Sequence, residues 1–176
     1  MLENVHDPHN LSAVLRSCDA VGIGTVHLVY TWEERPKLSR TSSASAVKWL
    51  CIVEHSSIAD CYQALRAKGF RIYATHLGEA SLDLYELDLV QPTALVFGNE
   101  HRGVSREALA LADAGVVIPM MGMVQSLNIS VACAVSLYEA LRQRRLAGAY
   151  DSAGLSDTEM RARLTHWLQR EGRLTS

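Results

Sequence analysis

The sequence has little lysine, no long apolar segment and no excess of one charge sign. Only Lys37, Lys48 and Lys68 are lysines among the 17 basic residues, and 19 acidic residues leave a net charge of −2. This balance excludes an argument for nucleic-acid binding from bulk charge. No apolar run approaches the roughly 20 residues of a membrane helix, so we expect no membrane association. The first residues lack the basic and apolar regions of a signal peptide, which predicts a cytoplasmic protein.

Cysteine and histidine are not spaced for disulfides or metal binding. The four cysteines include no C-x-x-C pair, and each lies in an apolar pattern. They are interpreted as small core side chains in a reducing compartment. The seven histidines lack the spacing of zinc ligands, and His6 and His9 are interpreted as loop residues. We therefore expect no metal.

Apolar residues and arginine are what the sequence does contain. Its 176 residues are 48% hydrophobic and 20% charged, which is typical of one globular domain. The planar fork of arginine suits phosphate and carboxylate groups. A composition bias of the genome explains the arginine excess equally well.

Short apolar runs alternate with helical patterns. Six runs bounded by turn residues predict buried strands: Leu2–Val5, Val26–Val29, Leu50–Val53, Ile72–Thr75, Ala94–Phe97 and Val116–Ile118. Apolar faces between them predict helices that begin near Leu11, after Ser57, at Ser105 and at Leu127, the last ending at Leu146. The alternation predicts an α/β fold with a mostly parallel sheet flanked by helices.

The last thirty residues predict a linker and one more helix. Small residues from Ala147 to Gly154 form the linker, and Ser156 and Glu159 form a capping box. The helix is too short to be a domain, so we expect it to pack on the body of the protein or on a second subunit.

Two polar segments follow predicted strands and precede predicted helices. In the first, Asn10 lies near a helix start and Arg16 follows six residues later. A helix cap and a solvated charge would explain this pair. In the second, Phe97 leads into Gly98-Asn99-Glu100-His101-Arg102-Gly103, and ligands of parallel sheets bind at such strand ends. Many glycine-rich turns bind nothing, and the dinucleotide-binding fingerprint is absent.

A third segment joins the last predicted strand to the long helix. It runs from Ile118-Pro119-Met120 through a loop of methionine and glycine to Ser126-Leu127-Asn128-Ile129-Ser130. Methionine and glycine can form an adaptable pocket wall. We predict that Ser126 caps the helix and that Asn128 lies in its first turn. A capped core helix with methionines that fill gaps is the alternative.

Together, the three segments resemble the motifs of the SpoU/TrmH branch of the SPOUT superfamily of knotted RNA methyltransferases. Its first motif is an asparagine followed six residues later by an arginine, as at Asn10 and Arg16. Its second is Phe-Gly-x-Glu-x-x-Gly, matched by residues 97–103. Its third is Ile-Pro-Met with Ser-Leu-Asn-Val-Ser-x-Ala, matched by residues 118–132 with Ile129 in place of valine. The resemblance implies methyl transfer from S-adenosylmethionine (AdoMet) to a ribose 2′-hydroxyl.

The resemblance also implies a domain organisation. Residues 1–146 would form a SPOUT methyltransferase domain with a deep trefoil knot in about 94–141, of which about Pro119 to Leu141 is threaded. Residues 147–176 would form the linker and the C-terminal helix. The family works as a homodimer with the site near the subunit interface.

Site residues follow from the same resemblance. The AdoMet pocket is expected to contain Thr75, Gly98, Ile118, Met120, Gly122 and Leu127. The catalytic group is expected to contain Arg16, Asn10, Glu100, Ser126 and Asn128. Arg16 would bind a substrate phosphate through both guanidinium nitrogens and stabilise the developing alkoxide. A role as general base is costly for a group with a pKa above about 12.

The substrate expectation rests on two stretches. Residues 2–22 and 119–144 are most similar to members that methylate guanosine 18 of the tRNA D-loop, so tRNA is the expected partner. Such members usually carry some tens of residues before the first motif, which here lies almost at Met1. Ribosomal RNA, another tRNA position and a catalytically silent RNA-binding knot protein are the alternatives. Local arginines would supply RNA affinity: Arg35, Arg40, Arg102, Arg142, Arg144, Arg145 and those of the final helix.

Overall fold

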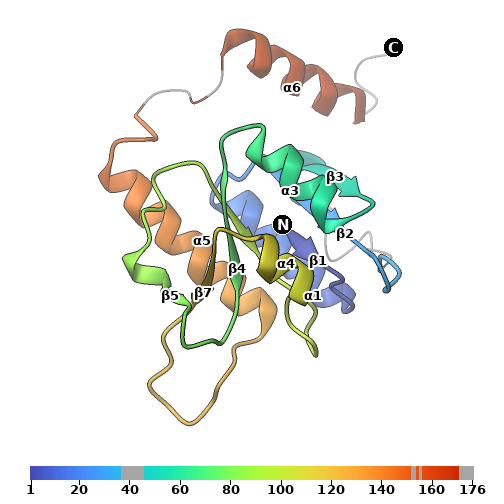
Figure 1. Ribbon diagram of the computed structural model, residues 1–176. Helices are drawn as coiled ribbons and strands as arrows, with labels where there is room; N and C mark the ends of the chain where they lie inside the picture. Colours follow the sequence, from blue (N-terminus) through green and yellow to red (C-terminus); the bar gives the residue numbers. More distant parts are fainter. Residues whose placement is uncertain (37–45, 152–153, 155, 171–176) are drawn as a thin grey trace.

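Parallel strands and helices alternate in the computed structural model, which describes residues 1–36, 46–151, 154 and 156–170 (Figure 1). The strands are β1 (Leu2–Glu3), β2 (Thr25–Val29), β3 (Cys51–His55), β4 (Arg71–Thr75), β5 (Leu82–Asp83), β6 (Thr93–Val96) and β7 (Ala114–Val117). The helices are α1 (Pro8–Ala20), α2 (Ala46–Trp49), α3 (Ile58–Arg66), α4 (Arg106–Leu111), α5 (Ile129–Leu146) and α6 (Asp157–Arg170), and a 3₁₀ turn spans Leu84–Glu86.

The strands form two hydrogen-bonded groups that meet at β1. One group has the order β1-β2-β3 and the other β5-β7-β4-β6. The Glu3 amide donates to the Phe97 carbonyl at 2.9 Å, and the Phe97 amide donates to the Met1 carbonyl at 3.1 Å. These bonds place β1 beside the end of β6. Every pairing between these strands is parallel, which confirms the predicted α/β class.

The junction of β1 and β6 is a topological switch point. From β1 the chain crosses through α1 to β2 on one side, and from β6 it crosses through α4 to β7 on the other. The loops that leave the two strands therefore diverge and leave a crevice between them. Ligands of open α/β sheets bind in such a crevice at the carboxyl ends of the strands.

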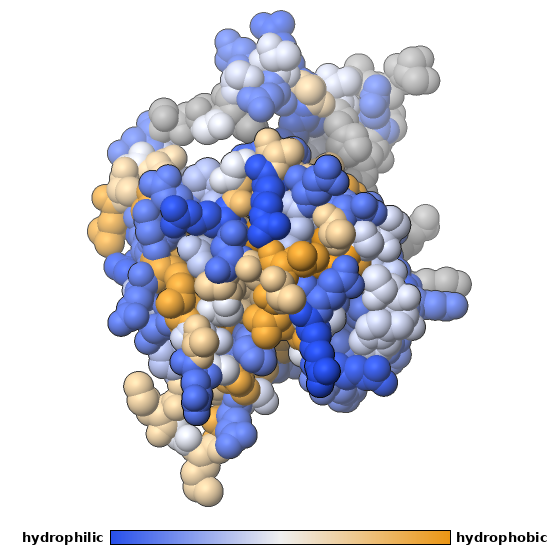
Figure 2. All heavy atoms as spheres, in the orientation of Figure 1, coloured by the Kyte–Doolittle hydropathy of each residue, from blue (hydrophilic) through white to orange (hydrophobic). Residues whose placement is uncertain are grey.

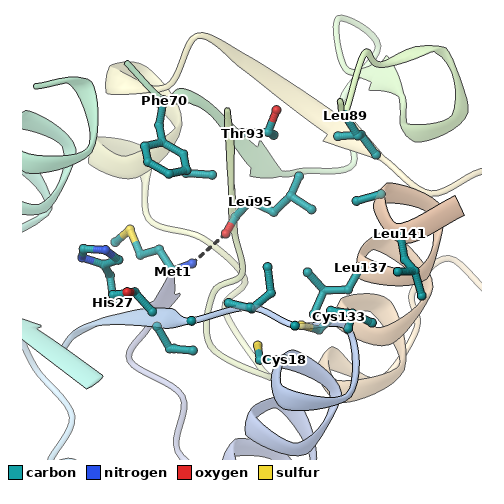
Figure 3. A pocket seen from close by; sticks show the side chains of 18 of the residues that line it. Met1, Cys18, His27, Phe70, Leu89, Thr93, Leu95, Cys133, Leu137 and Leu141 are labelled. Carbon is teal, nitrogen blue, oxygen red and sulfur yellow. Dashed lines mark hydrogen bonds between the residues drawn. The ribbon is translucent and has the colours of Figure 1, made fainter. Parts of the chain in front are cut away.

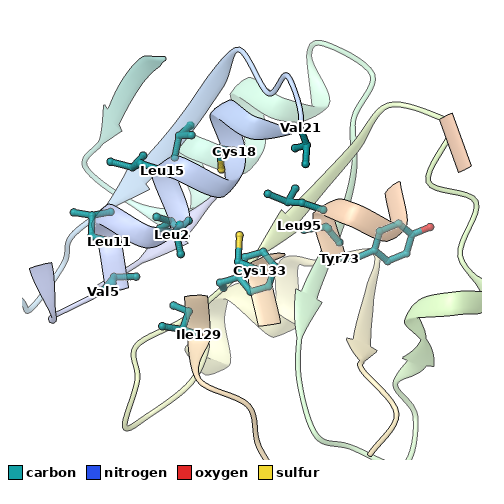
Figure 4. Close-up of a cluster of buried hydrophobic side chains, with 14 of the residues drawn as sticks. Leu2, Val5, Leu11, Leu15, Cys18, Val21, Tyr73, Leu95, Ile129 and Cys133 are labelled. Atoms are coloured by element: carbon teal, nitrogen blue, oxygen red, sulfur yellow. The ribbon is translucent and has the colours of Figure 1, made fainter. Parts of the chain in front are cut away.

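Two apolar clusters cover the two faces of the sheet. Tyr73, Leu95 and Val116 point toward α1 and α5, while Ile72 and Ala74 belong to the cluster under α3 and α4. This division follows from the strand geometry, in which successive side chains point to opposite faces. Figure 4 shows the first cluster, in which Cys18 of α1 and Cys133 of α5 face each other.

Serine caps begin two of the predicted helices, but the prediction for α5 was wrong. Ser57 and Ser105 each accept from a backbone amide at a helix start, as expected. The cap of α5 is Asn128, whose side chain accepts from the Ser130 amide at 2.8 Å. An asparagine two residues before an amide can close this turn as well as a serine can. Ser126 therefore remains in the preceding loop.

The remaining differences concern short elements and one cysteine. The 3₁₀ turn, β5 and α2 are too short to produce a periodic pattern, and the sequence did not predict them. Cys51 is exposed at the start of β3, whereas Cys18, Cys61 and Cys133 are buried as expected. The capping box of Ser156 and Glu159 is present, with the Ser156 amide donating to the Glu159 carboxylate at 2.9 Å.

The final helix contacts the body of the protein. The indole rings of Trp49 in α2 and Trp167 in α6 meet edge to face, with centroids 5.3 Å apart. The division into residues 1–146 and 147–176 stays a prediction. Among the described helices, none has the length and apolar character needed to cross a membrane.

Candidate active site

A carboxylate joins the two loops that diverge at the switch point. Glu100 lies in the loop after β6, and its carboxylate accepts two backbone hydrogen bonds from the loop after β1. The donors are the amides of His6 and Asp7, at 3.0 and 3.1 Å. Glu100 therefore fixes the path by which the chain enters α1, and it places the Asn10 side chain beside itself.

Two asparagines extend this contact to the start of α5. The Asn10 amide group donates to Glu100 at 3.1 Å, and its carbonyl oxygen accepts from the Asn128 amide group at 3.0 Å. These bonds join residues 90 and 118 positions apart in the chain. The structure thus brings together one predicted catalytic residue from each of the three motifs.

The hydrogen bonds also set the charge of Glu100. Partial burial is the largest single influence and raises the pKa of the carboxyl. The bonds from His6, Asn10 and Asp7 together outweigh it, so the pKa lies below its ordinary value of 4.5. Glu100 is therefore ionised at neutral pH, which suits a site that binds a cationic partner such as an arginine or a sulfonium group.

Replacing Glu100 with glutamine is expected to loosen the junction. The glutamine NH₂ group would face a backbone or side-chain N–H, so at least one bond is lost, at a cost of about 1.5 kcal/mol. This corresponds to a fall in Tm of about 3–6 °C in a domain of this size. Thermal unfolding of both proteins at pH 7 measures it.

The same pair of proteins tests the charge of Glu100. The pKa of Glu100 is lower in the folded protein than its ordinary value of 4.5. The ionised carboxylate therefore makes its full contribution to the free energy of unfolding above pH 4.5. That contribution, and with it the higher Tm of the wild type, is lost as the pH falls through the folded-state pKa. The exposed Glu107→Gln on α4 is the matched control, for which we expect a smaller loss, since Glu107 accepts none of these bonds and acts only on the dipole of a short helix. A Glu100→Gln protein with wild-type Tm at pH 7 would contradict the assigned contacts.

A cavity of about 480 Å³ opens beside this network, at the carboxyl ends of β4, β6 and β7. Five of the six predicted cofactor residues line it: Thr75, Gly98, Ile118, Met120 and Leu127. Glu100 and Ser126, from the predicted catalytic set, also line it. The apolar wall formed by Val116, Ile118 and Leu127 suits a flat aromatic ring.

Four predicted residues do not line the cavity: Asn10 and Asn128, which bond to each other beside it, and Gly122 and Arg16. Gly122 lies in the loop between β7 and α5 but is not among the lining residues. Arg16 is exposed on α1, and no hydrogen bond or ion pair joins it to another described residue. Because an α-helix turns by about 100° per residue, the side chain of Arg16, six residues after Asn10, points about 240° around α1 from the side chain of Asn10. Of the predicted catalytic residues, Asn10, Glu100 and Asn128 are thus joined by hydrogen bonds and Ser126 lines the cavity, whereas Arg16 lies apart from them.

Two buried asparagines shape the site, and the sequence analysis missed both. The Asn99 side chain donates to the Asn4 carbonyl at 2.8 Å and accepts from the His101 amide at 2.9 Å. Asn4 has a φ of 50°, and its side chain accepts from the Thr31 amide at 2.8 Å. Asparagine tolerates this backbone region and bonds to nearby amides. The available signal was an asparagine near the end of each predicted strand, with Asn4 inside Leu2–Val5 and Asn99 two residues after Phe97.

Three of the candidate RNA-binding arginines are engaged within the protein. Arg35 pairs with Glu54, and Arg142 with Glu139. Arg144 donates to the Leu89 carbonyl at 2.9 Å. Arg102 differs, because it lines the cavity and stacks on the exposed indole of Trp32 at 4.6 Å from the ring centroid. Arg40 lies outside the described residues.

A second cavity, of about 320 Å³, lies at the amino ends of β2 and β6 (Figure 3). Leu95, Leu137 and Leu141 form much of its wall, and His27 lies at its edge. None of the predicted catalytic residues lines it. The first cavity is therefore the candidate active site.

The fold and site define an α/β protein with a ligand pocket at the switch point of a parallel sheet. Residues 1–138 match the SpoU rRNA Methylase family. The chain is 49% identical over 170 residues to the tRNA (guanosine(18)-2'-O)-methyltransferase of Thermus thermophilus, covering 97% of this chain and 87% of that protein. The chain belongs to the SpoU methylase family.

Two solved structures extend the comparison. The A. aeolicus TrmH/SpoU tRNA modifying enzyme superposes with a TM-score of 0.90 at 38% identity, over 97% of this chain and 86% of that one. The SpoU methyltransferase AviRb from Streptomyces viridochromogenes, in complex with AdoMet, has a TM-score of 0.73 at 31% identity. That match covers 84% of this chain and 60% of the AviRb chain.

Proposed function

We propose that this protein transfers a methyl group from AdoMet to the ribose 2′-hydroxyl of guanosine 18 in the tRNA D-loop. The observation that carries the proposal is the bonded group of Asn10, Glu100 and Asn128 beside the 480 Å³ cavity. The high identity to the Thermus thermophilus enzyme over nearly the whole chain supports the choice of substrate.

The residues around the cavity fit AdoMet. Val116, Ile118 and Leu127 offer the adenine an apolar wall. Gly98 lets the backbone of Gly103 and Val104 lie directly against the end of β6 at the cavity edge, because a Cβ atom there would overlap that backbone. The Glu100 carboxylate faces the same space and favours a positive charge. When bound, AdoMet supplies an electrophilic methyl group on a positively charged sulfur.

The protein's own residues prepare the ribose hydroxyl. The hydroxyl is a poor nucleophile until its proton is removed, so groups that stabilise the alkoxide accelerate the reaction. Arg16 holds a substrate phosphate by two parallel hydrogen bonds and lowers the energy of the developing negative charge. Asn10 and Asn128, fixed by Glu100, orient the hydroxyl. The guanidinium stays protonated throughout, and the proton of the hydroxyl passes to the phosphate or to water.

A second copy of the chain completes the site. Met121, Met123 and Val124 are 96%, 100% and 66% exposed, and Figure 2 shows this loop as a largely apolar projection at the lower edge. Val131 and Tyr138 continue the apolar surface along α5. Such a surface is typical of an interface between subunits. We propose a homodimer in which Arg16 of one protomer serves the cavity of its partner.

We also propose that the chain forms a trefoil knot over about residues 94–141. The chain between β7 and α5 forms a long loop, and α5 then packs against α1 on one face of the sheet. The TM-score of 0.90 to the A. aeolicus enzyme supports the same path for this segment. A knot holds the Met120 to Leu127 loop at the cavity without the need for further packing around it.

Trp32 and Arg102 form a platform for an unpaired base. Trp32 is 47% exposed, and its ring already stacks with a guanidinium at the cavity edge. Stacking of a base on an aromatic ring contributes about 1–3 kcal/mol. We expect Trp32→Ala to raise the KM for tRNA roughly 10-fold, with AdoMet affinity unchanged. Trp32→Phe is the control and should retain most of the affinity, since it keeps the ring. Equal KM values for Trp32→Ala and wild type would exclude the platform.

Methyl transfer from labelled AdoMet to unmodified transcripts tests the function. The substrates are tRNA, a tRNA with guanosine 18 replaced, and 23S rRNA fragments, followed by nuclease mapping. We expect label on guanosine 18 alone. Label on rRNA would favour the second candidate function, 2′-O-methylation of ribosomal RNA, which is the activity in the name of the family. AdoMet binding without transfer to any RNA would indicate a silent RNA-binding protein.

A further inference from the structure

Two histidines and a cysteine meet on the sheet face that α3 covers. His27 of β2 and His55 of β3 point to this face, since His55 pairs in register with Val29, which lies in the cluster under α3. Cys61 of α3 is fully buried in the same cluster. One ligand atom from each of the three residues lies within 4.8 Å of the others.

We propose that His27, His55 and Cys61 form a zinc site. Two imidazole nitrogens and one thiolate are ligands that zinc prefers, and water can supply the fourth position of a tetrahedron. The proposal goes beyond methyl transfer, because none of the three residues lines the cavity of the candidate active site. It also departs from the sequence-based expectation of no metal, which rested on spacing along the chain.

The geometry requires a small adjustment. The Nδ1 atom of His27 and the Nε2 atom of His55 are 2.8 Å apart, and their rings stack at an angle of 21°. Bond lengths of about 2.0 and 2.3 Å to zinc place tetrahedral ligands about 3.4 Å apart for two nitrogens and about 3.6 Å for nitrogen and sulfur. The two histidine nitrogens must therefore separate by about half an ångström, and the Cys61 sulfur, which lies within 4.8 Å of them, must come to about 3.6 Å.

The surroundings allow a metal ion to enter. His27 lies at the edge of the 320 Å³ cavity, and His55 is partly exposed, so water reaches both rings (Figure 3). The amino group of Met1 and the side chain of Lys68 both act on His27 and oppose a cation. The negative charge of the Cys61 thiolate, formed when the metal displaces its proton, offsets this repulsion.

Such a site would tie the edge of the sheet to its covering helix. The three ligands come from β2, β3 and α3, so a bound ion would link α3, which packs on the sheet through apolar side chains, to the hydrogen-bonded pair of β2 and β3. Because a metal that binds only the folded state stabilises it, zinc should raise the Tm of the protein.

Cobalt(II) is the probe, because a thiolate ligand gives it a charge-transfer absorption that histidine alone does not. Untagged, chelator-treated full-length protein is titrated with cobalt and then with zinc. We expect one equivalent of cobalt to produce the band, zinc to remove it, and zinc to raise the Tm. Cys61→Ser should lose the band, and His55→Gln should weaken binding by more than about 10-fold.

Cys51→Ser is the matched control, since Cys51 lies on the same strand as His55 but is exposed. This variant should keep the band and the increase in Tm. Absence of the band in the wild type would overturn the proposal, as would a band that survives Cys61→Ser or disappears in Cys51→Ser. If Cys61→Ser does not fold, His55→Gln decides the question, because its ring is partly exposed and contributes little to the core.

Discussion

Replacing Arg16 with alanine is expected to lower methyl transfer to tRNA by about 10²–10³-fold, the typical loss when one group that stabilises a transition-state oxyanion is removed. AdoMet affinity should stay at the wild-type value, because the proposed partner of Arg16 is a phosphate of the RNA and not the cofactor. Tm should also stay constant, since the exposed side chain bonds to no other described residue. Single-turnover methylation with saturating tRNA, together with calorimetric AdoMet binding, measures both effects.

Two further variants separate the charge of Arg16 from its shape. Arg16→Lys keeps the charge but cannot form two parallel hydrogen bonds to a phosphate, so we expect it to remain strongly impaired. Near-wild-type turnover of Arg16→Lys would show that the bidentate role is wrong. Arg106→Ala, which removes an exposed arginine from α4, should leave turnover unchanged.

Replacing Gly98 with alanine is expected to remove AdoMet binding and to destabilise the fold. The new Cβ atom would overlap the Gly103 carbonyl group and the Val104 amide, which are backbone atoms that cannot rotate away. The Asn99 and Gly103 amides and carbonyls bond to each other at 2.8–2.9 Å and hold this turn closed. Overpacking of this kind costs about 3 kcal/mol, which lowers Tm by about 6–12 °C.

Gly122→Ala is the control for this experiment. A Cβ atom at Gly122 meets nothing within 4 Å, and the residue does not line the cavity. Its Tm and AdoMet affinity should match those of the wild type. If Gly98→Ala bound AdoMet as tightly as Gly122→Ala does, the cavity after β6 would not be the cofactor pocket.

Local patterns predicted most of the strands and helices because their causes are local. The apolar runs at Val26–Val29 and Ile72–Thr75 are strands whose two faces are both covered, so hydrophobicity alone revealed them. Ser57 and Ser105 marked helix starts because a cap acts over three residues. At the start of α5, Ser126 and Asn128 could both cap, and the bond from Asn128 to Asn10 favours the asparagine.

By itself, the sequence determined the α/β class, the three motifs and the family they resemble. Which motif residues lie side by side was decided by the tertiary structure, because the order of the strands depends on contacts between residues far apart in the chain. Pairing of Leu2 with Phe97 brings Glu100 to Asn10 across 90 positions. Pairing of β2 with β3 likewise brings His27 to His55, two histidines with no metal-ligand spacing in the sequence. Spacing along a chain reports which residues share an element, whereas a site requires that separate elements meet.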